Sequence, residues 1–413
     1  MRRGRLFAIG ATLVAVACVE ESVAPGRCPG FCPSGQIVVV DTVLRANISR
    51  DSAFRGYVTA FHATYMLAAD LPGFVDSRPI FRVPGLGPRL SISTGDTSTG
   101  PILGADSARL QVVVVRRDTA AHNLTLRLYR LPITIDSTTT FGDLAGSFTD
   151  SLVRTINVDT LLARAGHKDT VTGDSVFVDT TTHILTFSLK LAPAAARYIA
   201  ADSGKVAYGV RVSADSLASI ALSRGVALQW FLQLDSLGVT VRRKASAVGA
   251  NFTNFVFDPP APPLDSTLVV GGVPSARSIL RVTWPRVIRD SSQVIRGTLV
   301  LVSAAPVGGA PPDSFVLEAR TVLSDFGAKS PLDARFADTA VIHRGRRDTV
   351  AIEVTNILQA WALDTTAPTT FLLRSQTEAQ SFAEARFYPS LTAAFRPTLQ
   401  VTFVRRFQFG RRQ

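Results

Sequence analysis

Three cysteines are the residues of this chain whose type and position most clearly predict chemistry. Cys18 follows a positively charged start, Met1–Arg5, and the 12-residue apolar run Leu6–Ala17. This order is typical of a signal peptide, and the apolar run is too short to span a bilayer as a helix. We therefore expect residues 1–17 to be a signal peptide, the thiol of Cys18 to be acylated, and the protein to be an exported lipoprotein.

The residues around Cys18 leave a second route open. Ala15 and Ala17 fit a lipoprotein signal, but they also form the A-x-A site of the ordinary signal peptidase. Simple cleavage is therefore the alternative to lipidation, and Cys18 would then be a leader residue without further function. Val19, in place of aspartate, favours sorting to the outer membrane by the rule known from enteric bacteria.

Cys28 and Cys32 are separated by three residues that include Pro29 and Gly30. Export permits a disulfide, and these intervening residues allow a tight loop, so we expect the two cysteines to be bonded. Two free thiols or a functional site are the alternatives. A zinc site needs about four ligands, and no histidine lies near in the sequence, so no metal is expected there.

The histidines show no catalytic or metal-binding spacing, and we expect them on the surface or in packing. The chain contains no G-x-S-x-G, H-E-x-x-H or P-loop motif and no dinucleotide fingerprint in a βαβ context. We therefore expect no enzyme activity and no cofactor. Calcium held by aspartates from separate loops stays open. The histidines are His62, His122, His167, His183 and His343.

Three tryptophans are the best candidates for contact with a sugar, because aromatic faces stack on sugar rings. Trp230 alternates within an apolar strand, and Trp361 precedes further apolar residues, so both are predicted to lie in a core. Trp284 precedes Pro285 at a predicted strand end and is the candidate ligand-binding residue. Phe252, Phe255 and Phe257 are predicted to pack between domains.

The charge of the chain favours some partners over others. The formal net charge is +12, and without Arg2, Arg3 and Arg5 the balance is 41 − 32 = +9. The basic residues are scattered and form no nucleic-acid motif, which argues against nucleic acid. Anionic lipid and acidic polysaccharide remain suitable partners. The basic tail 406–413 is expected to be solvated.

The elements that must position these residues are predicted to be strands. Short runs with period-2 alternation, such as Leu124–Leu128 and Leu228–Leu234, recur between Asp-Ser and Asp-Thr turn signals. Helical patterns are scarce. The sequence therefore predicts an all-β protein, and its 413 residues suit two domains.

An internal repeat supports two related domains. Arg78–Val83 matches Arg277–Val282, and Ala108–Val112 matches Gly297–Leu301. Leu185–Leu189 likewise matches Val350–Val354, and each copy closes with a similar pair of strands. We expect two tandem antiparallel β-sandwiches of jelly-roll-like form. The predicted parts are the signal peptide 1–17, a lipid-anchored tether 18–36, a first sandwich 37–250 with a long insertion at 129–182, a linker 251–263, a second sandwich 264–405 and the tail 406–413.

The second copy resembles the DNRLRE-domain family, β-sandwich modules of bacterial surface and secreted proteins. The resemblance covers about residues 264–404, although the letters of the family's name do not occur here as a run. It implies an antiparallel sandwich, and some members of that family bind polysaccharide; no ligand residue can be transferred. The matching segments are Leu268–Gly272, Arg277–Val282, Val294–Val302, Val354–Trp361, Ala385–Ser390 and Arg396–Phe403.

These patterns together predict a non-enzymatic lipoprotein of the cell envelope, in the outer membrane, that acts as a binding or structural module. Polysaccharide is the expected ligand class. The alternative is a secreted polysaccharide-acting hydrolase or lyase with one sandwich as its accessory module. A cleft of histidine, tyrosine and carboxylates in the insertion 129–182 would favour the enzyme. A free strand edge or exposed apolar patch would favour a purely structural role.

Overall fold

A computed structural model of the chain describes residues 38–405, except 46, 94–96, 259–265, 310–314, 344 and 346. Strands make up about 51% and helices about 11%, and the sheets are antiparallel, which confirms the predicted all-β class. The signal peptide 1–17, the tether with Cys18, Cys28 and Cys32, and the tail 406–413 lie outside the described residues. Within the described part of the chain, no helix is long and apolar enough to cross a membrane.

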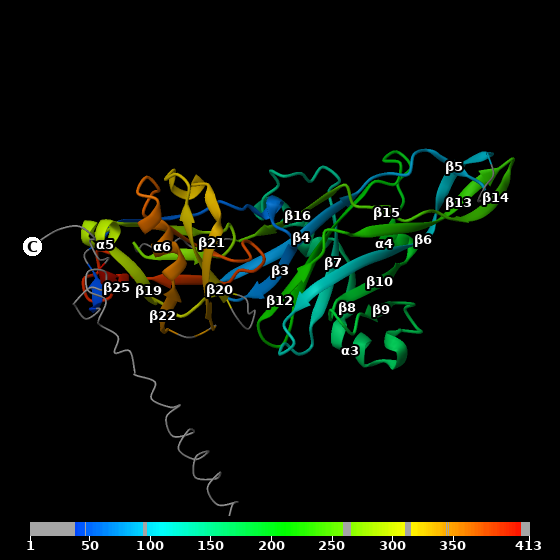
Figure 1. Cartoon of the computed structure of the whole chain (residues 1–413). Helices are drawn as coiled ribbons and strands as arrows, with labels where there is room; N and C mark the ends of the chain where they lie inside the picture. Colours follow the sequence, from blue (N-terminus) through cyan, green and yellow to red (C-terminus); the bar gives the residue numbers. More distant parts are fainter. Residues whose placement is uncertain are drawn as a thin grey trace, which may run out of the picture.

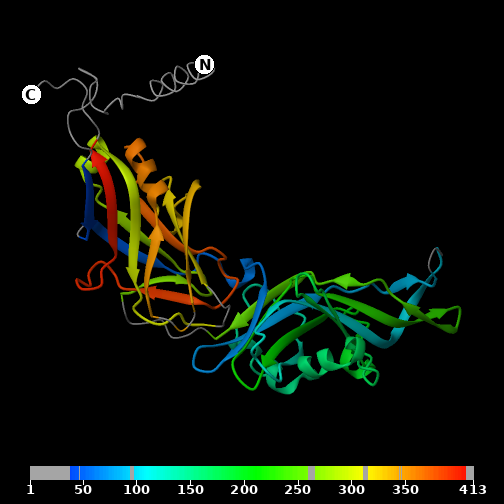
Figure 2. The same cartoon turned by 60° about the horizontal axis from the view of Figure 1, so that its bottom comes forward.

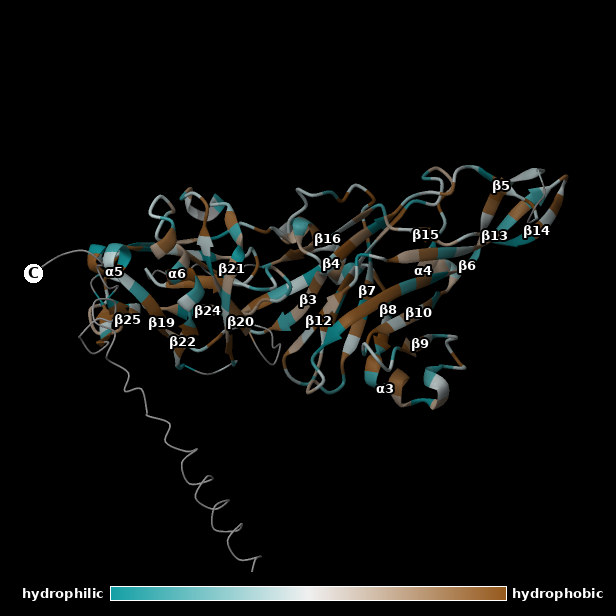
Figure 3. Cartoon of the chain, in the orientation of Figure 1, coloured by the Kyte–Doolittle hydropathy of each residue, from teal (hydrophilic) through white to brown (hydrophobic). Residues whose placement is uncertain are grey.

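The second sandwich consists of two sheets around one apolar core. Its strands alternate inward and outward residues, and hydrophobic and hydrophilic bands alternate along many strands in Figure 3. Trp361, on α6 (Thr355–Leu363), closes this core against Phe371. One sheet has the order β1 (Val39–Leu44), β25 (Thr398–Arg405), β19 (Ser292–Val302), β22 (Thr349–Glu353). The other sheet has the order β2 (Ile48–Phe54), β18 (Arg277–Val282), β23 (Thr370–Ser375), β20 (Phe315–Val322), β21 (Leu332–Ile342). In addition, β17 (Leu268–Gly271) pairs with β24 (Glu384–Phe387).

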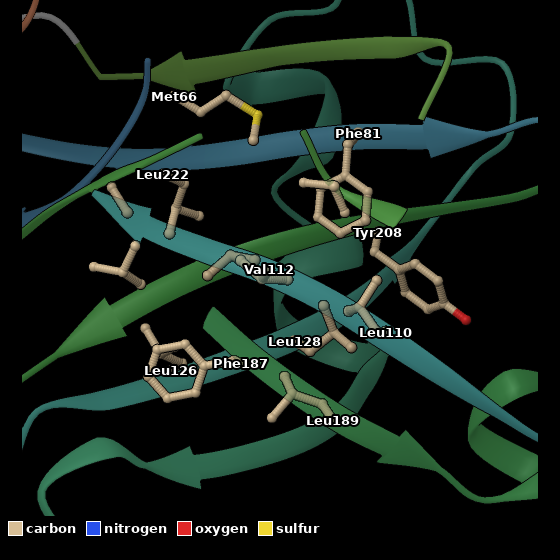
Figure 4. Close-up of a cluster of buried hydrophobic side chains, with 14 of the residues drawn as sticks. Met66, Phe81, Leu110, Val112, Leu126, Leu128, Phe187, Leu189, Tyr208 and Leu222 are labelled. Carbon is tan, nitrogen blue, oxygen red and sulfur yellow. The ribbon is translucent and has the colours of Figure 1, made fainter. Parts of the chain in front are cut away.

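The first sandwich also has two layers, but here hydrogen bonds join the two layers into one continuous sheet. The join is β3 (Met66–Leu71), which pairs with β4 on one side and β12 on the other. Side chains of both layers meet in its core, where Figure 4 shows Phe81, Leu110 and Phe187. One layer has the order β16 (Phe252–Phe257), β4 (Val75–Val83), β11 (Val206–Ser213), β7 (Thr125–Leu131), β8 (Leu152–Asn157). The other layer includes β9 (Ser175–Val178), β10 (Leu185–Leu191), β6 (Thr99–Arg117), β12 (Ala218–Leu222), β13 (Ala227–Ser236) and β14 (Val239–Lys244), together with the short strands β5 (Arg89–Ser91) and β15 (Val248–Gly249).

The internal repeat predicted from the sequence is present in the strand pairing. β11 lies between β4 and β7, as β23 lies between β18 and β20. β6 lies between β10 and β13, as β19 lies between β22 and β25. Arg78–Val83 and Arg277–Val282 also share one pattern of buried and half-buried residues, which confirms their predicted match.

One of the predicted matches is wrong by two residues. Leu110 of β6 and Leu299 of β19 are equivalent, because Leu228 and Leu399 oppose them in the same way. Leu110 also opposes Leu189, whereas Leu299 opposes Ile352. Leu189 is therefore equivalent to Ile352 and not to Val354. A shift by two residues keeps the same side chains on the inner face, so the alternation alone could not exclude it.

The structure corrects two domain boundaries. The sequence predicts residues 37–250 as the first sandwich, but β1 and β2 pair with β25 and β18 of the second. It predicts residues 251–263 as a linker, but β16 pairs with β4 of the first sandwich. The sequence assignment grouped chain neighbours, whereas strand pairing depends on which sheet edge is free. The second sandwich is therefore interrupted in sequence by the first.

The two sandwiches lie end to end (Figure 1 and Figure 2). At their junction, Phe382 of the second packs against Phe255 and Phe257 of the first, with ring centroids 6.2 and 5.9 Å apart. Backbone hydrogen bonds also run from Tyr57 to Ser275 and from Ser275 to Val58. The predicted interdomain packing is thus confirmed for Phe255 and Phe257.

Candidate functional site

The tryptophans do not form a binding surface. Trp230 and Trp361 lie in the cores, as predicted, but the expected exposure of Trp284 is wrong, because this side chain is 6% exposed. Its ring meets that of Trp361 edge to face at 6.1 Å, beside the short helix α5 (Arg286–Ser291) that follows it. A buried indole cannot stack on a sugar ring, so Trp284 is a packing residue and not a ligand residue.

A groove at the junction of the two sandwiches is a candidate site. We call it the junction groove, and its volume is about 970 Å³, which falls within the range of small-molecule sites. The helical turn η1 (Ala60–His62), strand β16 and the loop 137–142 form its walls, and the second sandwich contributes Pro274. In Figure 1, η1 and β16 lie beside each other next to the second sandwich.

Asn254, on β16, is the most informative residue of the junction groove. Its side chain is 4% exposed, it lines the groove, and its Oδ1 atom has no hydrogen-bond partner among the described residues. A buried polar atom without a partner costs about 1–3 kcal/mol, so such atoms are rare in folded proteins. Asn254 therefore brings an amide side chain, which can both donate and accept hydrogen bonds, to the wall of the groove.

Aromatic rings form part of the walls. Phe61 is 42% exposed and stacks on Phe252, with centroids 6.2 Å apart and planes at 24°. Phe141, on the loop 137–142, also lines the groove, and the guanidinium of Arg78 lies 4.3 Å from the centroid of the Phe141 ring. An exposed ring beside polar groups presents an apolar face to a ligand that also forms hydrogen bonds.

The loop that carries Phe141 is held by two aspartates. The hydroxyl of Thr138 donates to Asp136 at 2.6 Å, and the hydroxyl of Thr140 donates to Asp143 at 2.7 Å. These hydrogen bonds stabilise the charged carboxylates and lower the pKa of both aspartates below the usual value of 3.8. The loop therefore keeps these contacts throughout the neutral range.

The ionisable groups of the junction groove are few. His62 has its Nδ1 atom 2.9 Å from the hydroxyl of Thr59. Asp258 is the one acidic residue among the described residues that line the groove. Most glycoside hydrolases use two carboxylates across the scissile bond, and this groove offers one.

The insertion 129–182 contributes to the groove only through its first part. Its later elements, α3 (Val158–Ala163) and η3 (Ala165–His167), pack on β7, β8 and β9 away from the groove, and the ring of His167 contacts the carbonyl of Leu162. His62 is the one histidine among the described residues that line the groove. Across the described ranges, no three or more histidine, cysteine, aspartate or glutamate side chains gather in a way that could hold a metal.

Sequence reasoning missed Phe61, Asn254 and Asp258 as site residues. They come from parts of the chain nearly two hundred residues apart, and none belongs to a motif. The one available signal was Asn254 itself, a polar residue between Phe252 and Val256 on one face of a strand-like run.

Comparison with known proteins adds little to this geometry. No protein-family model matches the chain, and no curated protein matches it. Among solved structures, the chain is similar to "BspA_C_mut", with 10% identity over 91% of this chain and 92% of that chain and a TM-score of 0.15. It is also similar to the C-terminal domain of the Streptococcus pyogenes antigen I/II-family protein AspA, with 10% identity over 91% of this chain and 93% of that chain and a TM-score of 0.15. Both TM-scores are too low to support an argument about function.

Proposed function

We propose that this chain is a non-enzymatic protein of the cell envelope, anchored through Cys18, whose junction groove binds polysaccharide. The observation that supports the proposal most directly is the amide side chain of Asn254 in the wall of a groove that Phe61 and Phe141 also line. Sugars present both the hydroxyls that hydrogen-bond with an amide and the C–H faces that stack on aromatic rings.

The arrangement favours binding over hydrolysis. Asp258 has no second carboxylate beside it among the described lining residues, so the pair used by most glycosidases is missing there. The envelope location rests on the leader and Cys18, and the resemblance of residues 264–404 to the DNRLRE-domain family is consistent with a surface protein. A polysaccharide-acting enzyme is the second candidate function, and the experiment must distinguish it from a protein that only binds.

The test is binding of the full chain to an array of neutral and acidic polysaccharides at low and moderate salt. We expect at least one polysaccharide to bind at moderate salt, because the contacts are hydrogen bonds and stacking and not only charge attraction. Phe61→Ala should weaken this binding by about tenfold, which corresponds to a loss of about 1.4 kcal/mol. Asn254→Leu should also weaken it.

Phe177→Ala is the matched control, because Phe177 is an exposed phenylalanine (68%) of the same sandwich, on β9, outside the groove. It should leave binding unchanged. Binding that disappears at moderate salt, or that responds equally to Phe61→Ala and Phe177→Ala, would contradict the proposal. Release of new reducing ends or unsaturated products from the bound polysaccharide would instead establish the enzyme.

A further inference from the structure

The edge strands β2 and β16 occupy equivalent places in the two sandwiches. β2 pairs with β18 so that Phe54 opposes Arg277, and β16 pairs with β4 so that Val256 opposes Arg78. Since Arg277 and Arg78 are equivalent, residues 50–54 and 252–256 occupy the same slot, pair by pair. β2 and β16 are therefore equivalent strands in two copies of one fold.

The strands that precede them are equivalent as well. Leu44 of β1 opposes Leu399 on β25, and Val248 of β15 opposes Leu228 on β13. Farther along the same edges, Val39 opposes Val404, and Arg242 of β14 opposes Gln233. The segment β1–β2 thus corresponds to the segment β14–β16.

The two segments stand at different places in the chain relative to the sandwich with which they pair. β1–β2 comes before the first repeat in the chain and covers the second, whereas β14–β16 comes before the second repeat and covers the first. In Figure 2 the blue N-terminal strands lie beside the red C-terminal strand in one sandwich. β14–β16 thus completes the sandwich that it directly follows in the chain, whereas β1–β2 completes a sandwich from which the whole first sandwich separates it in sequence.

The β1–β2 segment is held mainly by its backbone. Of its described residues, only Leu44 and Ile48 are buried, while its strands make long runs of cross-strand pairs with β25 and β18. Polar contacts add to the pairing: the side chain of Asn47 donates to the carbonyl of Thr283 at 2.7 Å, and Arg55 pairs with Glu384 at 2.7 Å. Backbone pairing of this kind is recognised equally well when the strand comes from another chain.

We propose that the second sandwich is a strand-acceptor site, and that β1–β2 of a second copy of this chain can occupy the edges of β18 and β25. Removal of the molecule's own β1–β2 leaves these two edges unpaired, and free edges bind strands. The first sandwich is contiguous from β3 to β16 and stays folded during the exchange. The exchange links molecules through the second sandwich, as closed pairs or as open chains.

The test uses disulfide trapping in the full chain with Cys18, Cys28 and Cys32 changed to serine, which removes all native thiols. Asp41 of β1 and Thr402 of β25 oppose each other, and the Thr402 hydroxyl donates to the Asp41 carboxylate. The double variant Asp41→Cys/Thr402→Cys should close an internal disulfide. A double variant that forms no internal disulfide would contradict the pairing on which the proposal rests.

Exchange is then measured by mixing two single variants, Asp41→Cys and Thr402→Cys, each with a different mass tag, at high concentration under oxidising conditions. We expect a disulfide-linked heterodimer in several-fold excess over the control mixture of Thr402→Cys with Leu237→Cys. Leu237 is fully exposed at the turn between β13 and β14, so that its thiol reports random collision. An excess of a peptide of residues 38–55 should suppress the matched heterodimer. Equal yields in the matched and control mixtures would overturn the proposal.

Discussion

Arg277 and Glu378 form a two-point ion pair inside the second sandwich, with Nε–Oε1 and Nη2–Oε2 distances of 2.6 Å each. Both side chains are at least nine-tenths buried. The ring of Tyr57 covers the guanidinium, with its centroid 3.1 Å from the central carbon. Glu378 lies in the loop after β23 that also carries Phe382, so this pair holds the junction loop near the first sandwich.

Glu378→Gln should destabilise the protein by about 3–5 kcal/mol, because it leaves the buried charge of Arg277 without its countercharge. The measurement is the free energy of unfolding from a denaturant titration. Arg296→Gln is the control, since the Arg296–Glu353 pair is exposed (69% and 50%) and should contribute about 1 kcal/mol or less. Equal losses from the two variants would show that the Arg277–Glu378 pair has no special role.

Glu318 is linked to this ion pair, because Arg374 pairs with both Glu378 and Glu318, and it makes the stability depend on pH. Burial alone would raise the pKa of Glu318, but hydrogen bonds from Arg320 and Arg374 outweigh it and leave the pKa below the usual 4.5. The stabilisation is therefore fully present above pH 4.5 and is lost as the pH falls through the lowered folded pKa. Glu318→Gln should flatten the stability curve below pH 4.5, as measured by thermal unfolding between pH 3 and pH 7. A curve unchanged by the substitution would contradict this assignment.

Much of the architecture could be predicted because the repeat preserves burial. Arg78–Val83 and Arg277–Val282 match in sequence and in burial, and two sandwiches follow from them. β2 gave no comparable signal. Ile48 is its one buried residue and most of the others are polar, since an edge strand is held by backbone pairing, so nothing in its sequence indicates which sandwich it joins.

The junction groove could not be predicted for a different reason. Phe61, Phe141 and Asn254 meet only because η1, a loop of the insertion and β16 converge beside β4. Trp284, which the sequence favoured, is covered by α5, a helix of one and a half turns too short to produce a clear periodic pattern.

Trp284→Ala should therefore act on stability and not on binding. Loss of this buried indole removes its contact with Trp361 and leaves a cavity, which should cost about 3–5 kcal/mol. Trp284→Phe fills part of the space and should cost less. The measurement is denaturant unfolding of both variants, together with polysaccharide binding under conditions where they remain folded. A loss of binding without a loss of stability would restore Trp284 as a ligand residue.

Asn254→Leu should have the opposite profile. Asn254 lies on the face of β16 that also presents Val256, which packs with Ile80 and Tyr129 in a small apolar cluster. Leucine removes the unpartnered acceptor and extends this cluster, so the free energy of unfolding should rise by about 1 kcal/mol. Asn254→Asp is the contrasting variant, because it places an unpaired charge at the same buried position and should destabilise the protein at pH 7. A polar group kept at a cost to stability is expected where function requires it. A stabilised Asn254→Leu variant that still binds polysaccharide at full strength would separate the two properties and remove Asn254 from the site.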